Sequence, residues 1–374
     1  MKLWGVVLLV WVASALGQET AKVPLHRSPE VNADRSITFR YLGAGASKVE
    51  VEIDWLNKKV PMVKGADGVW SFTTAPLPPQ IYSYSFYVDG EQIFDPGNLD
   101  VAPNLVYHDN MVEVPGSGQE LWDVTPVPHG EVHRHVYTTK VLVGLRQAQE
   151  PYMVYTPPGY DAHAAKPYPV LYLLHGWSQT EAGWTSTEKA ALILDNLLAA
   201  GKIKPMVVVM PQGYGDMSFV ERHEIWEHKE PVDHNTRLFG QALLTEMLPR
   251  VEAEYRVARD REGRAIAGLS MGGLESLSVG LGNPDKFAWV GGFSSAVHLF
   301  AYPNPVAGLD PKTAKLRLLW IACGTEDSLI EPNRKLVTYL KGAGVPVTAV
   351  ETPGAHVSQV WRWNLAEFAQ LLFR

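Results

Sequence analysis

The chain has 374 residues, of which 46% are hydrophobic and 20% are charged, and its formal net charge is −7. This length allows two domains with hydrophobic cores, since a domain usually spans roughly 150 residues, and the composition is that of a folded globular protein. Its 40 acidic residues outnumber its 33 basic ones and no basic block occurs, which argues against nucleic acid and anionic membranes as partners.

The first 17 residues have the build of a secretory signal peptide. Lys2 precedes an apolar stretch from Leu3 to Val12, and small residues follow at Ala13, Ser14, Ala15 and Gly17. The apolar stretch is shorter than the roughly 20 residues of a membrane span. We therefore expect a secreted or periplasmic protein that is not membrane-bound after cleavage; an uncleaved anchor or a buried helix is the alternative.

Residues 23–114 contain short β-type segments separated by turns. Strands are expected over 37–42, 48–53, 69–73 and 80–88, and no helix of normal length is indicated. In the last segment the alternation places Tyr82, Tyr84, Phe86 and Val88 on one face, which is typical of a half-buried strand. The pattern predicts a small all-β sandwich.

Three stretches of this region resemble the immunoglobulin-like early-set domains grouped as carbohydrate-binding module family 48: Gly68–Ser71, Tyr82–Gly90 and Asp95–Asn98. The resemblance implies a domain that binds polysaccharide or that only packs on a catalytic domain. Trp55, Trp70 and Tyr82 are candidate platforms for sugar rings, although aromatic residues of a sandwich also form its core.

Residues 115–131 are rich in proline and glycine and are expected to form a semi-rigid linker. His129, His133 and His135 lie at the start of the next strand. They lack a neighbouring cluster of carboxylates or cysteines, and a zinc site needs three or four converging ligands. We therefore predict no metal site.

Strand and helix signals alternate over residues 132–374. Strands are expected over 152–156, 170–174, 206–210, 265–267, 289–292, 316–322 and 345–350, and helices over 188–200, after 235, and over 271–281, 332–343 and 359–372. Pro249 is expected to bend or break the helix that follows Asn235, and residues 213–234 are interpreted as a loop over a cleft. The alternation predicts an α/β fold with a mainly parallel sheet covered on both faces.

A Gly-x-Ser-x-Gly sequence surrounds Ser270, directly after an expected buried strand and before an expected helix. This context is that of the strained turn that exposes a nucleophilic serine in the α/β-hydrolase fold. Such a serine needs a base and a residue that orients the base. In the chain order of this fold, Asp327 is the candidate acid, with Glu326 as the alternative, and His356 is the candidate base.

The developing oxyanion of acyl transfer needs two backbone donors. The N–H of Met271 follows the nucleophile, and the loop after strand 170–174 is expected to supply the second, the N–H of Trp177. His175 in that loop is given a structural role. Cys323, the only cysteine, excludes an intrachain disulfide and is interpreted as a buried thiol rather than a nucleophile.

Five motifs of this region resemble the esterase-D-like α/β-hydrolases of carbohydrate esterase family 1: Tyr155–Tyr160, Leu173–Trp177, Met210–Gly215, Gly268–Gly273, and Gly354–His356 with Val360 and Trp361. The family includes feruloyl and acetylxylan esterases and is similar to enterochelin esterases and mycolyltransferases. The resemblance implies the same roles for Ser270, Asp327 and His356, and a two-step mechanism that uses no metal or cofactor.

Aromatic residues are concentrated in the loops expected above the site: Trp177, Trp184, Tyr214, Phe219, Trp226, Trp361 and Trp363. Trp177, Tyr214, Trp226 and Trp361 are predicted to contact substrate, whereas Trp184, Trp361 and Trp363 also fit a packing role. The leading hypothesis is a secreted feruloyl esterase acting on plant cell-wall polysaccharide, as feruloylated arabinoxylan or its oligosaccharides. The alternatives are an acetylxylan esterase, an enterochelin-type esterase, which the signal peptide opposes, and a non-catalytic carbohydrate-binding protein.

Overall fold

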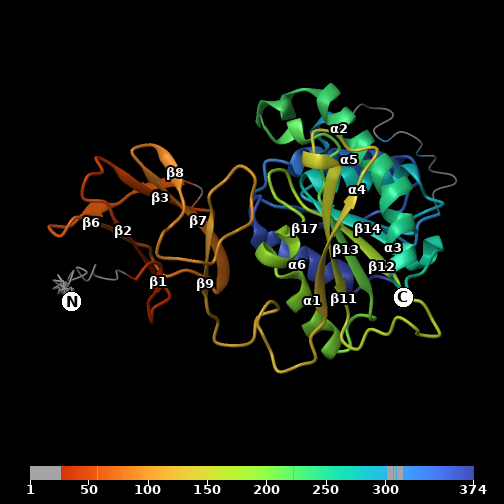
Figure 1. Cartoon of the computed structure of the whole chain (residues 1–374), viewed down its shortest axis with the longest axis horizontal. Coiled ribbons are helices and arrows are strands. Elements are labelled where there is room, and N and C mark those ends of the chain that lie inside the picture. The colour runs from red at the N-terminus through yellow and green to blue at the C-terminus, as the bar shows by residue number, and fades with distance from the viewer. Residues whose placement is uncertain (1–26, 57, 222, 301–305, 307–308, 310–314) are drawn as a thin grey trace, which may run out of the picture.

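The computed structural model describes residues 27–374 except 57, 222, 301–305, 307–308 and 310–314, and they form a smaller all-β unit and a larger α/β unit (Figure 1). The expected signal peptide, residues 1–17, lies outside the described residues. Within the described part of the chain, none of the helices combines the length and the apolar character that crossing a membrane requires.

Two antiparallel sheets form the smaller unit and enclose one apolar core. The first sheet has the order β1 (Glu30–Val31), β2 (Ile37–Leu42), β6 (Val69–Thr73) and β5 (Val63–Lys64). The second has the order β4 (Lys58–Pro61), β3 (Val49–Ile53), β7 (Gln80–Val88) and β8 (Glu91–Ile93), and β9 (Asn110–Val114) also pairs with β7. The predicted alternation of β7 is confirmed, because Tyr82, Tyr84 and Phe86 all point into this core.

The start of β7 is buried on both faces, which corrects the expectation of a half-buried strand. Ile81, which points away from the sandwich core, is only 4% exposed and packs into a hydrophobic cluster of the larger unit. The two units therefore share a continuous apolar contact. Of the three candidate sugar platforms, Trp70 and Tyr82 take the alternative core role, because both are buried in the sandwich core, whereas Trp55 is half exposed.

The larger unit contains an eight-stranded sheet within the described residues. Its order is β10 (Glu131–Thr138), β11 (Gln149–Thr156), β13 (Val207–Pro211), β12 (Val170–Leu174), β14 (Arg264–Leu269), β15 (Trp289–Phe293), β16 (Leu318–Gly324) and β17 (Thr348–Thr352). The pairs β10–β11 and β11–β13 are antiparallel and the other pairs are parallel. The prediction of a mainly parallel sheet is confirmed, and its central strands are apolar because both faces are covered.

Helices cover the two faces of this sheet (Figure 1). One face packs against α1 (Ala190–Ala199) and α6 (Ser358–Ala369), and the other against α2 (Lys229–Ala242), α3 (Leu248–Glu254), α4 (Met271–Gly282) and α5 (Ile330–Gly342). α2 begins before the expected end of the loop over 213–234, because Val232 and Phe239 face the core. A wide π-type turn over Leu243–Met247 lies just before Pro249, and Pro249 itself has no N–H to continue the helical ladder.

The segment expected as a linker runs along α1 and is hydrogen-bonded to it. The Thr125 hydroxyl donates to Asn196, 2.5 Å away, and the Gly130 N–H donates to Asp195 at 3.0 Å. His129 lies 3.0 Å from the other carboxylate oxygen of Asp195, so its imidazole has a structural partner. No group of three metal-binding side chains occurs among the described residues.

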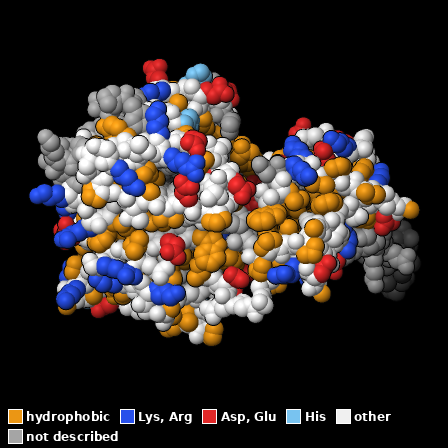
Figure 2. Space-filling model, turned by 180° about the vertical axis from the view of Figure 1, so that it is seen from behind, with side chains coloured by type: hydrophobic (Ala, Val, Ile, Leu, Met, Phe, Trp, Pro, Cys, Tyr) orange, Lys and Arg blue, Asp and Glu red, His pale blue; other side chains and the backbone are white. Residues whose placement is uncertain are grey.

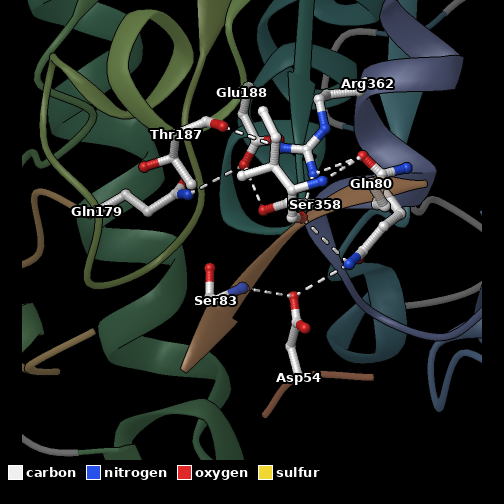
Figure 3. A network of polar contacts seen from close by, with 10 residues as sticks. Asp54, Gln80, Ser83, Gln179, Thr187, Glu188, Ser358 and Arg362 are labelled. Carbon is white, nitrogen blue, oxygen red and sulfur yellow. Dashed lines mark hydrogen bonds and ion pairs between the residues drawn. The ribbon is translucent and has the colours of Figure 1, made fainter. Parts of the chain in front are cut away.

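A buried polar cluster joins the two units where β7 meets α6. We call Arg362, Glu188, Gln80 and Asp54 the junction network (Figure 3). The Arg362 guanidinium donates to the Gln80 side chain at 3.0 Å, and it also donates to the carbonyl oxygens of Ile81 and Thr187. These bonds fix the smaller unit to the helix that follows the loop of His356.

Candidate active site

Ser270 occupies a strained turn between β14 and α4. Its φ of 53° and ψ of −111° lie outside the regions that residues with a Cβ ordinarily adopt, and its N–H donates to the Phe293 carbonyl at 2.9 Å. Tight packing explains the glycines around it, because a Cβ on Gly272 would lie 2.5 Å from the carbonyl oxygens of Leu174 and His175. The turn holds the serine hydroxyl at the carboxyl edge of the sheet.

The three predicted side chains come together at this edge. The Ser270 hydroxyl lies 3.0 Å from His356 Nε2, and His356 Nδ1 lies 2.8 Å from Asp327 Oδ2. Asp327 follows β16, and His356 lies on the loop between β17 and α6. In a neutral imidazole whose Nδ1–H donates to Asp327, Nε2 is free to accept the serine proton.

Asp327, and not Glu326, pairs with the histidine. Asp327 is 2% exposed, whereas Glu326 is exposed to solvent. Burial alone would raise the pKa of Asp327, but its hydrogen bond and charge interaction with His356 and the hydrogen bond from the Leu329 N–H hold that pKa below its usual value. The carboxylate therefore stays ionised and orients the imidazole.

The loop after β12 lies against the turn of Ser270. The Gly272 N–H donates to the His175 carbonyl at 3.1 Å, and a Cβ on Gly176 would lie 3.4 Å from Ser270 Cβ. Met271 is the first residue of α4, so its backbone lies beside the serine. The loop therefore adjoins the serine as expected, and the roles of the Met271 and Trp177 N–H groups as oxyanion donors stay predictions.

His175 is a structural tether of this loop. Its ring is buried, and burial lowers its pKa to about 4, so it is neutral. Nδ1 lies 2.8 Å from the Gly176 carbonyl, and Nε2 accepts the Gly213 N–H at 2.9 Å. Cys323 is not suited to act as a nucleophile, because burial and the nearby charge of Asp327 raise the pKa of its thiol to about 12.

Ser270 and His356 open onto a cleft of about 550 Å³, a size suited to a small organic group. A family model described as a putative esterase matches residues 148–371. The chain belongs to this esterase family. The prediction of a carboxylic ester hydrolase is thereby confirmed at the level of the family.

Relatives of this esterase agree with the expected family. An endo-1,4-beta-xylanase/feruloyl esterase of Xylanibacter ruminicola is 30% identical over 94% of this chain, and the chain spans 46% of that protein's length. The structure of a ferulic acid esterase of carbohydrate esterase family 1 from Anaeromyces mucronatus covers 67% of this chain and 93% of its own, with 25% identity and a TM-score of 0.58.

The arrangement of both units also has a solved counterpart. An enterobactin esterase of Shigella flexneri covers 90% of this chain and 92% of its own, with 18% identity and a TM-score of 0.66. At this identity the likeness concerns the fold alone. The fold that the two proteins share includes the smaller unit as well as the α/β unit.

Three of the four aromatic residues predicted to contact substrate line the esterase cleft, namely Trp177, Trp226 and Trp361. The Trp361 ring packs edge-on against His356, with 5.0 Å between centroids. The prediction for Tyr214 is wrong, because its ring is fully buried and its hydroxyl donates to the Gln179 carbonyl beneath the loop. Trp184 has the packing role, since it is fully buried and donates to the Leu174 carbonyl.

The smaller unit supplies cleft residues that were not predicted from the sequence. Asn104, Tyr107 and Asp109 line the same cleft as Ser270. We call residues 104–109 the rim loop. The sequence signal for them was the apolar run Leu105–Tyr107. In the structure all three side chains are exposed, and solvent-facing apolar residues side by side point to a binding surface.

Replacing Gly272 by alanine is expected to destabilise the esterase by about 1–3 kcal/mol, because the new methyl group collides with backbone that cannot move away cheaply. The free energy of unfolding in urea measures the effect. Gly342→Ala is the matched control, since Gly342 ends α5 and a Cβ there meets nothing within 4 Å. Equal stability of the two variants would contradict the tight packing at Gly272.

Proposed function

We propose that this protein is an exported serine esterase that releases feruloyl groups from plant xylan. One observation carries the proposal: a hydrogen-bonded Ser270–His356–Asp327 arrangement opens onto a cleft lined by tryptophans. The proposal of export rests on the expected signal peptide.

Catalysis proceeds through an acyl-enzyme. His356 Nε2 takes the proton of the Ser270 hydroxyl as its oxygen attacks the ester carbonyl, and Asp327 stabilises the imidazolium that forms. The N–H groups of Met271 and Trp177 stabilise the oxyanion, each donor contributing about 2.7–4 kcal/mol to the transition state. His356 returns the proton to the leaving alcohol and then activates water, which releases the acid and frees Ser270.

The aromatic lining supports a phenolic acyl group. Trp226 is half-buried in the cleft wall, where it packs edge-on against Phe219 with 5.1 Å between ring centroids. A planar hydroxycinnamoyl ring gains about 0.5–1.5 kcal/mol from such aromatic neighbours beyond its burial. An acetyl group offers no ring and gains nothing from them. The names of the Xylanibacter and Anaeromyces relatives point to the same acyl group.

The full-length protein is tested on methyl ferulate and on acetylated xylan. Release of ferulate with little acetate is the expected result. Acetate release without ferulate release would favour the acetylxylan esterase, and hydrolysis of a cyclic catecholate ester alone would favour the enterochelin-type enzyme.

Trp226→Ala is expected to lower kcat/KM for methyl ferulate about threefold to tenfold, through loss of ring contact, and to leave hydrolysis of p-nitrophenyl acetate unchanged. Trp363→Ala is the control, because Trp363 is half exposed and contacts Trp122 instead of lining the cleft. An equal loss on both esters would show that Trp226 supports the structure and does not select the acyl group.

A further inference from the structure

The rim loop is fixed to the oxyanion side of the cleft by direct contacts. The Leu105 N–H donates to the Ser178 carbonyl at 2.7 Å, and the Asn104 amide donates to the Ser178 hydroxyl at 3.0 Å. The Tyr107 ring meets the Trp177 ring edge-on, with 6.2 Å between centroids. The smaller unit thus reaches the residue whose N–H is proposed to bind the oxyanion.

The loop is also held internally, so its side chains have defined positions. The side-chain oxygen of Asn104 accepts hydrogen bonds from the N–H groups of Val106 and Tyr107, at 2.8 and 2.9 Å. Asp109 accepts hydrogen bonds from Ser85 and Gln92, both on the second sheet of the smaller unit. The junction network anchors that sheet to α6 (Figure 3).

The shape of the proposed substrate assigns its two halves to different parts of the cleft. The acyl half is one ring, which the tryptophan-lined pocket encloses. The alcohol half belongs to a sugar chain, which cannot enter a pocket and must leave over an open edge. The rim loop is such an edge, because Tyr107 is 38% exposed and Leu105 is 45% exposed while Tyr107 still lines the cleft.

The chemistry of the rim loop fits a sugar ring. Tyr107 offers an aromatic surface for the C–H face of the ring, and Asp109 Oδ2, the carboxylate oxygen that is not bonded to Ser85 and Gln92, offers an acceptor for its hydroxyls. Exposed hydrophobic residues continue along the same unit at Leu99 and Val101, and Figure 2 shows hydrophobic side chains gathered on this unit and at its junction with the larger one.

We propose that the rim loop is a glycosyl subsite of the esterase cleft, in which Tyr107 stacks on the sugar that carries the ester. The inference rests on the proposed function and extends it: the smaller unit acts as a wall of the catalytic site. Direct sugar contact then lies at Tyr107, and not at the buried Trp70 and Tyr82.

The test compares two feruloyl esters in the full-length protein, methyl ferulate and a feruloylated arabinoxylan oligosaccharide. Tyr107→Ala is expected to raise KM for the oligosaccharide about threefold to tenfold, as the loss of one stacking contact predicts. An effect that reaches Trp177 would change both esters alike, so the readout is the ratio of the kcat/KM values for the oligosaccharide and for methyl ferulate, which is expected to fall about threefold to tenfold. Tyr107→Phe keeps the ring and is expected to behave as wild type on both esters.

Val106→Ala is the matched control, because Val106 is an exposed neighbour that does not line the cleft. Tyr107→Leu keeps apolar volume but has no ring. If the alanine variant has a lowered Tm, the leucine variant replaces it in the comparison of the two esters. Equal changes on both esters, or no change on either, would overturn the subsite. A wild-type protein that cleaves neither feruloyl ester would instead refute the proposed function, a result distinct from failure of the subsite alone.

Discussion

Replacing Ser270 by alanine is expected to lower kcat on methyl ferulate by about 10⁴-fold or more, because loss of the nucleophile of a Ser-His-Asp group leaves only binding and oxyanion stabilisation. His356 then has no hydroxyl to deprotonate, although its bond to Asp327 remains. Substrate binding, measured by the affinity for ferulate, is expected to persist. Steady-state kinetics with an unchanged Tm would identify the loss as chemical.

Ser278→Ala is the control for this experiment. Ser278 lies on the same helix α4, is half-buried and does not line the cleft, so its variant is expected to retain wild-type kcat. An unchanged rate in Ser270→Ala would refute the nucleophile assignment. A wild-type protein that binds xylan but hydrolyses no ester would favour the non-catalytic carbohydrate-binding alternative.

The positions of Ser270, Asp327 and His356 were open to prediction because each follows a strand of a parallel sheet. The carboxyl ends of such strands meet at one edge, so chain order alone brings these residues together. Asp327 was favoured over Glu326 from the sequence, but chain order alone does not separate the two residues. They are adjacent on one turn, and only the three-dimensional path of the chain buries Asp327 and leaves Glu326 in solvent.

Residues whose roles depend on contacts between distant segments escaped prediction. Tyr214 follows a strand end and looks like a cleft residue in the sequence, yet its ring lies beneath the 175–179 loop, bonded to the Gln179 carbonyl. Tyr107 lines the cleft only because the smaller unit docks on α6 and on the loop after β12. Neither periodicity nor a local motif encodes such docking, since the contacts join segments far apart in the chain.

Arg362→Met is expected to lower the free energy of unfolding by about 3–5 kcal/mol, because removal of the arginine leaves the buried charge of Glu188 without its partner. Arg362 is 1% exposed, and its Nη1 lies 3.8 Å from Glu188 Oε2. The remaining Glu188 carboxylate is fully buried, and burial already raises its pKa to about 7 against the opposing effect of Arg362. Urea unfolding of the full-length protein measures the change.

Arg334→Met provides the matched control on the surface. Arg334 forms ion pairs with Glu331 and Glu351, but it is exposed to solvent, and exposed pairs contribute at most about 1 kcal/mol. Similar losses in the two variants would contradict a special role for the junction network. Adding Glu188→Gln to Arg362→Met removes the buried charge and is expected to recover part of the lost stability, which a double-mutant cycle measures.

Activity is expected to fall together with stability in Arg362→Met, because the junction network adjoins both sides of the catalytic group. Glu188 accepts a hydrogen bond of 2.8 Å from the hydroxyl of Ser358, which lies two residues after His356. Gln179, which accepts the Gly176 N–H at 2.9 Å, also approaches Glu188. A shift of Glu188 would therefore move both the loop that carries His356 and the loop after β12, and would lower kcat on methyl ferulate, an ester without a sugar. Loss of stability with unchanged kcat would instead mean that the network only joins the two units.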